Sequence, residues 1–424
     1  MKTEESNYLK NRKILVIVTG SIAAVKTPIL VSNLIKEGAA VRCVVTKSAS
    51  RLVSPLSLAT LSRNVCYQDI DQWNPHQSKP LHIDLAEWAD LVLVAPLSAS
   101  SLSRWVNGLG EGLAASLLIA CEKPIIAAAA MNTAMWSNSA VKENWNKLKC
   151  FQNLIALSPS EGLLACDRIG DGRMINIEVI KLALESTLIQ IKKTQSLEAD
   201  LNGLNILVTA GATIEDLDPT RFISNRSSGL MGVLIAQAAK LRGAEVELVH
   251  GPLQVSSNLL EGINTFKARS GLEMQKIIKN LQPKANLIAM SAAITDLRRK
   301  GGQNEQKLDK KHFQKSLPNS LELVPDILSE LITNKRKNQI VLGFTALTGN
   351  DDEIKKITAL KKATKGCDLI FANPIDRSGQ GLDSPLNGGW LSGPNETMVP
   401  ISTDSKLSIA HLLLDELIKL LNHT

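Results

Sequence analysis

The fold is decided by two short stretches of sequence, Lys13–Gly20 (KILVIVTG) and Asn205–Gly211 (NILVTAG). Each is an apolar run, rich in β-formers, that ends in glycine. A helical stretch follows each run (residues 28–36 and 232–241), and a Gly-Ala-x-Val sequence then opens another apolar run. Strand, helix, glycine cap and strand form the βαβ unit of a parallel sheet. The sequence therefore predicts an α/β protein with one plan in both halves.

Further apolar runs extend each half, at residues 90–95 and 125–129 in the first and at 286–290, 340–344 and 369–372 in the second. Near-continuous apolar strands are typical of parallel sheets buried on both faces. The segment from 185 to 202 is helical and then polar and charged, which makes it the best domain boundary. We predict two Rossmann-like, doubly wound parallel-sheet domains, residues 1–190 and 203–424, joined by a helical and polar linker.

The composition fits a globular protein that binds small anionic molecules. Of the 424 residues, 44% are hydrophobic and only 3% are aromatic, and the formal charge is +7. Basic residues are spread along the chain and few rings are present for base stacking, so no nucleic acid is expected as a partner. The six cysteines include no Cys-x-x-Cys pair, which argues against disulfides and a structural zinc site.

The sequence also predicts a cytoplasmic protein without membrane contact. Its apolar stretches fall short of the ~18 residues that span a bilayer. The first twelve residues are charged and polar, and the apolar run that follows is too short for a signal peptide.

The first half carries a weak signal for a mononucleotide. Gly20-Ser21-Ile22-Ala23-Ala24 opens a helix directly after a strand, where backbone amides and a hydroxyl can receive a phosphate. The dinucleotide fingerprint Gly-x-Gly-x-x-Gly is absent, and the second strand ends in Thr46-Lys47-Ser48 rather than in an acid for a ribose. Nicotinamide binding is therefore disfavoured, whereas Thr46 and Ser48 suit a second polar contact to a mononucleotide.

The second half differs by a polar insertion after its first strand. The interval from Gly211 to Gly243 is longer than that from Gly20 to Gly38, and it contains the run TRFISNRSSG at 220–229. Doubly wound sheets bind ligands at this edge. Arg221 and Asn225 can face one ligand with a guanidinium fork and an amide. A basic patch that follows the run AAITD at 292–296 suits a triphosphate; its members are Lys300, Lys307, Lys310, Lys311 and His312.

Four motifs of the first half, taken together, resemble the flavin-dependent cysteine decarboxylases. They are GSIAA at 20–24, HIDL at 82–85, AMNTAMW at 130–136 and ACDRIGDGRM at 165–174. The resemblance runs from about residue 12 to 180 and is to the phosphopantothenoylcysteine decarboxylase type. His82, Asn132 and Cys166 would each be ordinary residues without it.

This resemblance implies FMN as cofactor, bound near Gly20, Ser21 and the loop at 97–100. It assigns to the flavin site Thr46, Ser98, Ser100 and Met131. It implies that His82 assists proton removal, that Asn132 holds the substrate carboxylate and amide, and that Cys166 on a flap is the acid that finishes the reaction. Oxidation of the substrate thiol to a thioaldehyde would supply the electron sink that decarboxylation needs.

The second half, from residue 203 to about 420, resembles the phosphopantothenate–cysteine ligases. The motifs are TAGAT at 209–213, DPTRFISNRSSG at 218–229, AAITD at 292–296, PDIL at 325–328, GFT at 343–345 and Ala372-Asn373. The implied reaction starts when the carboxylate of 4′-phosphopantothenate attacks CTP, giving an acyl-cytidylate and pyrophosphate. Cysteine then displaces CMP.

The ligase resemblance also implies roles for individual residues. Arg221 and Asn225 would act on the acyl intermediate, and Lys307 would stabilise the triphosphate alongside Mg²⁺. Asp296 would lie near the nucleotide or the metal, and Gly211 and Phe344 would belong to the nucleotide site. The metal ligands themselves are not predicted. Leu230, Val324 and Leu347 stand where the family usually has Lys, Asn and Glu.

Two alternatives remain open at the level of sequence. A glycosyltransferase with two Rossmann-like domains and a sugar nucleotide fits the length and the architecture. A flavin- or nucleotide-binding regulator with vestigial catalytic residues is the non-enzymatic alternative. The resemblance also suggests a homo-oligomer, with the decarboxylase site built between subunits.

Overall fold

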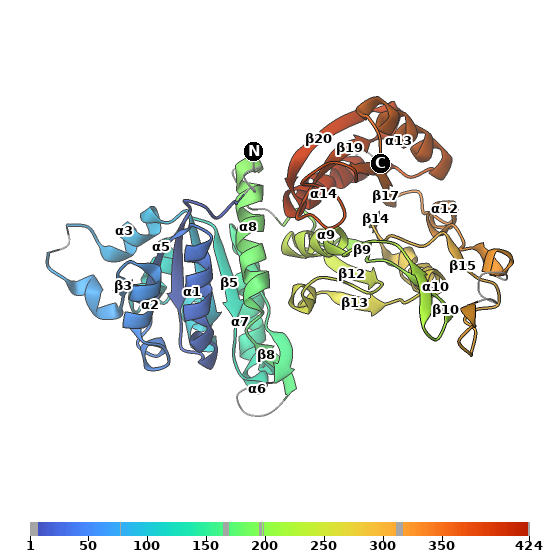
Figure 1. The fold of residues 1–424 in the computed structure, drawn as a ribbon. Helices are drawn as coiled ribbons and strands as arrows, with labels where there is room; N and C mark the ends of the chain where they lie inside the picture. The colour runs from blue at the N-terminus through green and yellow to red at the C-terminus, as the bar shows by residue number, and fades with distance from the viewer. Residues whose placement is uncertain are drawn as a thin grey trace. The chain divides into compact units, whose positions relative to one another are not determined.

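The computed structural model describes residues 7–76, 78–163, 169–194, 197, 199–310 and 317–422. The chain forms two compact units that divide between Glu198 and Ala199. Both are α/β units built on a parallel sheet, as the sequence predicts (Figure 1).

The first unit is built on a six-stranded sheet in which every pairing is parallel. The strand order is β3-β2-β1-β4-β5-β6. The chain adds strands on one side of β1 up to β3 and then on the other side from β4 onward, as in doubly wound folds. The strands are β1 Lys13–Val18, β2 Ala40–Val45, β3 Cys66–Tyr67, β4 Leu91–Leu97, β5 Ile125–Ala129 and β6 Leu154–Leu157.

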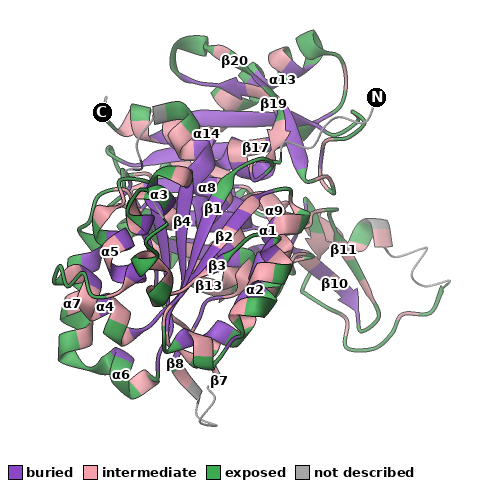
Figure 2. Ribbon diagram, turned by 90° about the vertical axis from the view of Figure 1, so that its left-hand side faces the viewer, coloured by how far each residue is buried: buried purple, intermediate pink, exposed green. Residues whose placement is uncertain are grey.

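Helices cover this sheet, and one antiparallel hairpin follows its last strand. The helices are α1 Thr27–Lys36, α2 Pro55–Ser62, α3 Leu81–Trp88, α4 Ala99–Val106, α5 Leu113–Ala120, α6 Thr133–Ser137, α7 Ser139–Lys149 and α8 Ile177–Thr194. The hairpin pairs β7 Ser160–Leu163 with β8 Ile169–Arg173. The central strands are buried along their length, and the outer faces of the helices are exposed (Figure 2). This pattern explains why the strands read as unbroken apolar runs.

The second unit has an eight-stranded sheet in the order β13-β12-β9-β14-β17-β18-β19-β20. Its first six strands are parallel, and they are β9 Asn205–Ala210, β12 Glu245–His250, β13 Asn264–Lys267, β14 Leu287–Met290, β17 Ile340–Leu347 and β18 Leu369–Pro374. The last two, β19 Leu386–Ser392 and β20 Met398–Ser405, are antiparallel additions at the edge. These two strands were not predicted, because they mix polar residues and glycine with apolar ones and lack the buried-strand pattern.

The remaining elements of the second unit are helices and two small hairpins. The helices include α9 Leu230–Leu241, α10 Gly271–Leu281, α12 Ile327–Thr333, α13 Asp351–Lys365 and α14 Lys406–Asn422. One hairpin pairs β15 Leu297–Arg299 with β16 Leu321–Leu323. The other pairs β10 Ile214–Asp218 with β11 Arg221–Ser224, so the polar insertion is an ordered hairpin followed by a loop.

A buried arginine joins the start of this unit to its last helix. Arg242, only 4% exposed, forms a bidentate ion pair with Asp200 and a second ion pair with Asp415 on α14 at 2.7 Å. It also donates to the carbonyl of His411 at 3.2 Å. A buried guanidinium is stable here because it is bonded to two carboxylates and one backbone carbonyl.

We expect Arg242→Met to lower the free energy of unfolding of the second unit, because Asp200 and Asp415 would both lose their buried partner. Breaking a buried ion pair costs about 3–5 kcal/mol. The low end of this range is expected here because both aspartates are about one-third exposed. Chemical denaturation monitored by circular dichroism measures this loss. Lys240→Met, which removes a charge from the same helix at a more exposed pair, is the matched control. Equal stability of the two variants would contradict the view that the buried ion pairs of Arg242 stabilise the second unit.

Candidate functional sites at two sheet edges

The first site forms where the sheet of the first unit reverses its strand order. Thr19 at the end of β1 is fully buried, and its hydroxyl donates to the carbonyl of Pro96 at 2.7 Å while accepting the amide of Ser98 at 2.8 Å. This pair of bonds ties the loop after β1 to the loop after β4. The loops that carry Gly20, Ser21, Ser98 and Ser100 are thereby held side by side at the edge where such folds bind ligands. Nothing in the sequence around Thr19 predicted this role, because both partners of its hydroxyl are distant in the chain.

Two neighbouring cavities open at this edge and share Gly20, Ser98 and Ser100 in their walls. The larger, about 600 Å³, is mostly apolar; its lining includes Ile22, Val25, Ala130, Met131, Asn132, Met135 and Gly172. The smaller, about 300 Å³, carries hydroxyls and cations; its lining includes Thr46, Lys47, Ser48, Ser101 and Arg104. Both volumes lie in or near the range of small-molecule sites.

The residues present fit FMN, which joins a flat apolar ring system to a phosphate. The larger cavity offers apolar walls for a ring. The smaller offers Lys47 as a cation beside Arg104, which is paired with Glu111. It also offers the amino end of α4, where Ser98 caps the helix by accepting the amide of Ser101 at 3.4 Å. Cations and a helix amino end favour a phosphate. Gly20 is needed at the shared wall because a Cβ there would lie 2.5 Å from the Cβ of Ser48.

The decarboxylase residues predicted from sequence divide into three groups. Asn132 and Met131 lie in the wall of the larger cavity, and the Asn132 side chain also caps α6 by accepting the amide of Ala134 at 2.9 Å. His82 lies within α3, and it does not line either cavity of the described chain. Cys166 lies outside the described residues. The structure therefore brings Asn132, but not His82, to the predicted flavin site.

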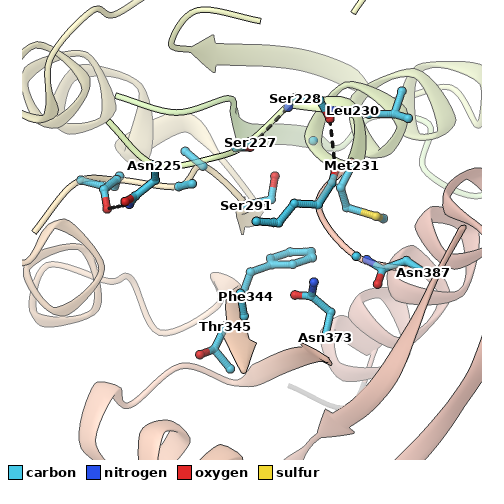
Figure 3. A pocket seen from close by; sticks show the side chains of 18 of the residues that line it. Asn225, Ser227, Ser228, Leu230, Met231, Ser291, Phe344, Thr345, Asn373 and Asn387 are labelled. Carbon is cyan, nitrogen blue, oxygen red and sulfur yellow. Dashed lines mark hydrogen bonds between the residues drawn. The ribbon is translucent and has the colours of Figure 1, made fainter. Parts of the chain in front are cut away.

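The second unit repeats this arrangement between β9 and β14. Thr209 is fully buried, its hydroxyl accepts the amide of Ala292 at 3.1 Å, and its carbonyl accepts the hydroxyl of Ser291 at 2.5 Å. A cavity of about 380 Å³ lies here, and its lining comes from the loop after β11, the start of α9, the segment after β14, and β17 to β19 (Figure 3). A buried threonine thus joins neighbouring strand ends in both units.

Three of the predicted ligase residues line this second-unit cavity: Asn225, Asp296 and Phe344. The exposed side chain of Asn225 lies at the edge of the cavity and donates to the carbonyl of Ile294 at 2.9 Å (Figure 3). Phe344 packs edge-on against Phe371 with ring centroids 5.7 Å apart, which fixes its ring in the wall. Gly211 lies just behind the lining, where a Cβ on Gly229 would come 3.0 Å from its amide nitrogen.

Arg221 and Lys307 do not line the cavity but lie together around Asp218, a residue to which sequence reasoning gave no role. The buried carboxylate of Asp218 accepts the hydroxyl and amide of Thr220, at 2.9 and 2.8 Å, and the amide of Arg221 at 2.9 Å. Its other oxygen accepts the amide of Leu308, the neighbour of Lys307, at 3.3 Å and lies 3.4 Å from the Arg221 guanidinium. Burial alone would raise the pKa of Asp218, but these hydrogen bonds and Arg221 hold it below its ordinary value.

We expect Asp218→Asn to lower ligation by about tenfold, because an amide nitrogen in place of the second oxygen would face two donors, the Leu308 amide and Arg221. The segment that carries Lys307 would then lose its bond to Asp218 and keep the bond from the Asn304 amide to the carbonyl of Leu217 at 3.1 Å. CTP-dependent pyrophosphate release measures the effect. Asp216→Asn on the same strand, where the pair with Arg269 is more exposed, is the matched control and should retain activity.

Four further residues line the second-unit cavity without having been predicted as site residues: Lys361, Asn373, Asn387 and Lys406. Asn373 stood in a quoted motif, and its 7% exposure shows an amide buried at the end of β18. Lys406 could have been found as a cation that shares its helix face with the apolar positions Ala410 and Leu414. Lys361 and Asn387 gave no signal in the sequence.

Within the described part of the chain, no group of three or more His, Cys, Asp or Glu side chains could hold a metal ion. The helices of the same residues include none with the length and apolar character that a membrane span requires.

Fold and sites together define a two-domain α/β protein with a cavity at the ligand-binding edge of the parallel sheet in each unit. Residues 2–188 match the family model described as flavoprotein, and residues 201–421 match the model described as DNA/pantothenate metabolism flavoprotein C-terminal domain. The coenzyme A biosynthesis bifunctional protein CoaBC of Bacillus subtilis (strain 168) is 35% identical over 425 residues, covering 98% of this chain and 99% of that protein. The CoaBC of Escherichia coli (strain K12) is 33% identical over 417 residues, with 97% of both chains covered.

Two solved structures each match about half of the chain. A PPC decarboxylase mutant with pantothenoylaminoethenethiol is 32% identical, with a TM-score of 0.39, and covers 44% of this chain and 100% of its own. The C-terminal domain of a CoaBC protein is 26% identical, with a TM-score of 0.43, and covers 54% of this chain and 100% of its own.

The chain belongs to the family of bifunctional coenzyme A biosynthesis proteins. It is an enzyme with an amino-terminal flavoprotein decarboxylase unit and a carboxy-terminal ligase unit. This membership removes the glycosyltransferase alternative and the non-catalytic one.

Proposed function

We propose that the two units catalyse consecutive steps on one substrate. The unit that spans residues 203–424 joins 4′-phosphopantothenate to cysteine at the expense of CTP, with Mg²⁺. The unit that spans residues 1–190 decarboxylates the resulting 4′-phosphopantothenoylcysteine to 4′-phosphopantetheine. The observation that supports two activities is the presence of a separate cavity at the equivalent sheet edge of each unit, one mostly apolar and one with polar and apolar walls in about equal measure.

In the decarboxylase unit, bound FMN supplies a two-electron acceptor for the substrate thiol. Gly20, Ser21, Thr46, Ser98 and Ser100 hold it at the sheet edge, with Met131 in the apolar wall. Asn132 is the N-cap residue of α6 and lines the larger cavity, where its amide can orient the substrate carboxylate. Cys166 returns a proton at the end of the reaction.

In the ligase unit, the chain must bring an unreactive carboxylate to a triphosphate and then protect a mixed anhydride. Phe344 and Asp296 bind the nucleotide in the wall of the cavity, behind which Gly211 allows close packing. Asn225 orients the acyl group, and Arg221 and Lys307 offset the charge that develops on the phosphates. Mg²⁺ binds together with the triphosphate.

The decarboxylase site is completed by a second copy of the chain in a homo-oligomer. His82 does not line the cavities of its own described chain, and Ile22, Val25 and Ile29 beside the larger cavity are each more than half exposed. Exposed apolar residues next to a pocket are typical of protein interfaces. Sedimentation of the flavin-loaded chain tests this, since a monomer with full decarboxylase activity would contradict it.

Purification of the full chain tests the flavin assignment directly. The purified protein should be yellow, with flavin released on denaturation, and should decarboxylate 4′-phosphopantothenoylcysteine supplied from outside. A colourless chain that takes up no FMN and still decarboxylates would contradict the assignment. Pyrophosphate release that depends on CTP and phosphopantothenate tests the ligase unit separately.

A further inference from the structure

A lysine is buried in the wall of the second-unit cavity. Lys406 is the first residue of α14 and is only 3% exposed. Its Nζ donates one hydrogen bond, to the carbonyl oxygen of Leu382 at 3.0 Å. Leu382 lines the same cavity, as do Asn387 on β19 and Gly381.

This ammonium has fewer partners than a buried cation needs. An ammonium carries three donors, and the carbonyl of Leu382 accepts only one. Among the residues that the structure describes, no carboxylate lies within ion-pair distance of Nζ, whereas the similarly buried Arg242 has two. Burial lowers the pKa of Lys406 to about 8, and exposed Asp383 only partly opposes the shift. A buried ammonium without a carboxylate partner would be stabilised by a bound anionic ligand.

The same carbonyl places the ammonium beside the amino end of α9. Leu382 also accepts the hydroxyl of Ser228 at 3.4 Å, and Ser228 in turn accepts the amide of Leu230 at 3.4 Å, the first residue of α9 (Figure 3). The first-turn residues Leu230, Met231 and Gly232 line the cavity. First-turn amides lack partners within their helix and attract anions. A buried cation and a twelve-residue helix therefore meet one cavity from two sides.

We propose that the Lys406 ammonium and the amino end of α9 together bind a phosphate group of a ligase substrate. This inference rests on the ligase activity proposed above and adds a residue to its site. Both CTP and 4′-phosphopantothenate carry phosphate, so the chemistry is shared between two sources. The kinetic experiment distinguishes them.

The kinetic test compares Lys406→Met with Lys419→Met in the full chain. Lys419 lies on the same helix with its side chain 64% exposed, so the control removes the same charge away from the cavity. Lys406→Met should raise one KM by about 10- to 100-fold, because charge-assisted hydrogen bonds to phosphate are lost. A rise confined to CTP assigns the triphosphate, and a rise confined to phosphopantothenate assigns its phosphate. Lys406→Arg should recover part of the loss.

A binding measurement gives a second readout that does not depend on turnover. Tripolyphosphate should raise the melting temperature of the wild-type ligase unit and of Lys419→Met, but not that of Lys406→Met. Decarboxylation of supplied substrate by the other unit serves as the check on folding, and Lys406→Gln replaces Lys406→Met if the latter is insoluble. Unchanged KM values together with equal stabilisation by tripolyphosphate would overturn the inference. If tripolyphosphate stabilised the chain only when Lys406 is present, but the chain did not ligate, the proposed function would be wrong and the phosphate site would still stand.

Discussion

Replacement of Gly172 by alanine should abolish flavin binding and lower decarboxylation by about 100-fold or more, as a misplaced pocket wall does. Gly172 on β8 lines the larger cavity, and its carbonyl accepts the amide of Met131 at 3.0 Å. A Cβ at this position would lie 2.2 Å from the carbonyl oxygen of Met131. That contact is with backbone, so a side-chain rotation cannot relieve it. The strand must separate from Met131 and Asn132, which form the opposite part of the wall.

The flavin absorbance of the purified variant measures this effect, and ligation by the second unit should be unchanged. Gly110→Ala is the matched control, because its Cβ would meet Ser116 and Ile119 at ordinary distances of 3.6 and 3.7 Å. A yellow, active Gly172→Ala protein would show that this wall does not hold the cofactor.

Replacement of Asn225 by alanine should lower ligation by about 100- to 1,000-fold, the cost of removing one preorganised polar group from an active site. The Asn225 side chain lies in the cavity wall and donates to the carbonyl of Ile294, which joins the loop after β11 to the segment after β14. Its loss removes both an amide that can orient the acyl group and the bond that holds this loop in place. Pyrophosphate release reports the activation of the carboxylate by CTP, and formation of 4′-phosphopantothenoylcysteine reports the later attack by cysteine. Measured separately, the two assign the loss to one step or the other.

Asn334→Ala provides the comparison for Asn225→Ala. Asn334 is exposed at the end of α12, and its amide also donates to a backbone carbonyl, that of Glu330, at 3.0 Å. It should retain ligation. If Asn225→Ala also retained ligation, the assignment of the second-unit cavity as the ligase site would fail.

The parallel cores were predictable because burial on both faces leaves a direct mark in sequence. β5 begins and ends at the predicted residues 125 and 129, and α1 and α9 differ from the predicted helices by one or two residues at their starts. The antiparallel edge strands β19 and β20 were missed because packing against neighbouring elements, rather than their own pattern, fixes them.

Most of the predicted residues that the structure places in cavity walls come from motifs that end a strand, whereas Phe344 lies within β17. Ser98, Ser100, Asn132, Asn225 and Asp296 all follow strands or hairpins, and the structure places them in cavity walls. Thr19, Thr209 and Asp218 act through hydrogen bonds to residues distant in sequence, which no local pattern shows. Lys406 joins its cavity from the far end of the chain, so its role depends on the folded sheet order.

One measurement tests the central claim that the chain joins and then decarboxylates one substrate. The full chain, loaded with FMN, is incubated with 4′-phosphopantothenate, cysteine, CTP and Mg²⁺, and the products are read by mass. We predict 4′-phosphopantetheine in wild type, accumulation of 4′-phosphopantothenoylcysteine in Gly172→Ala, and neither product in Asn225→Ala. Absence of both products in the wild-type chain, with FMN bound, would contradict the account.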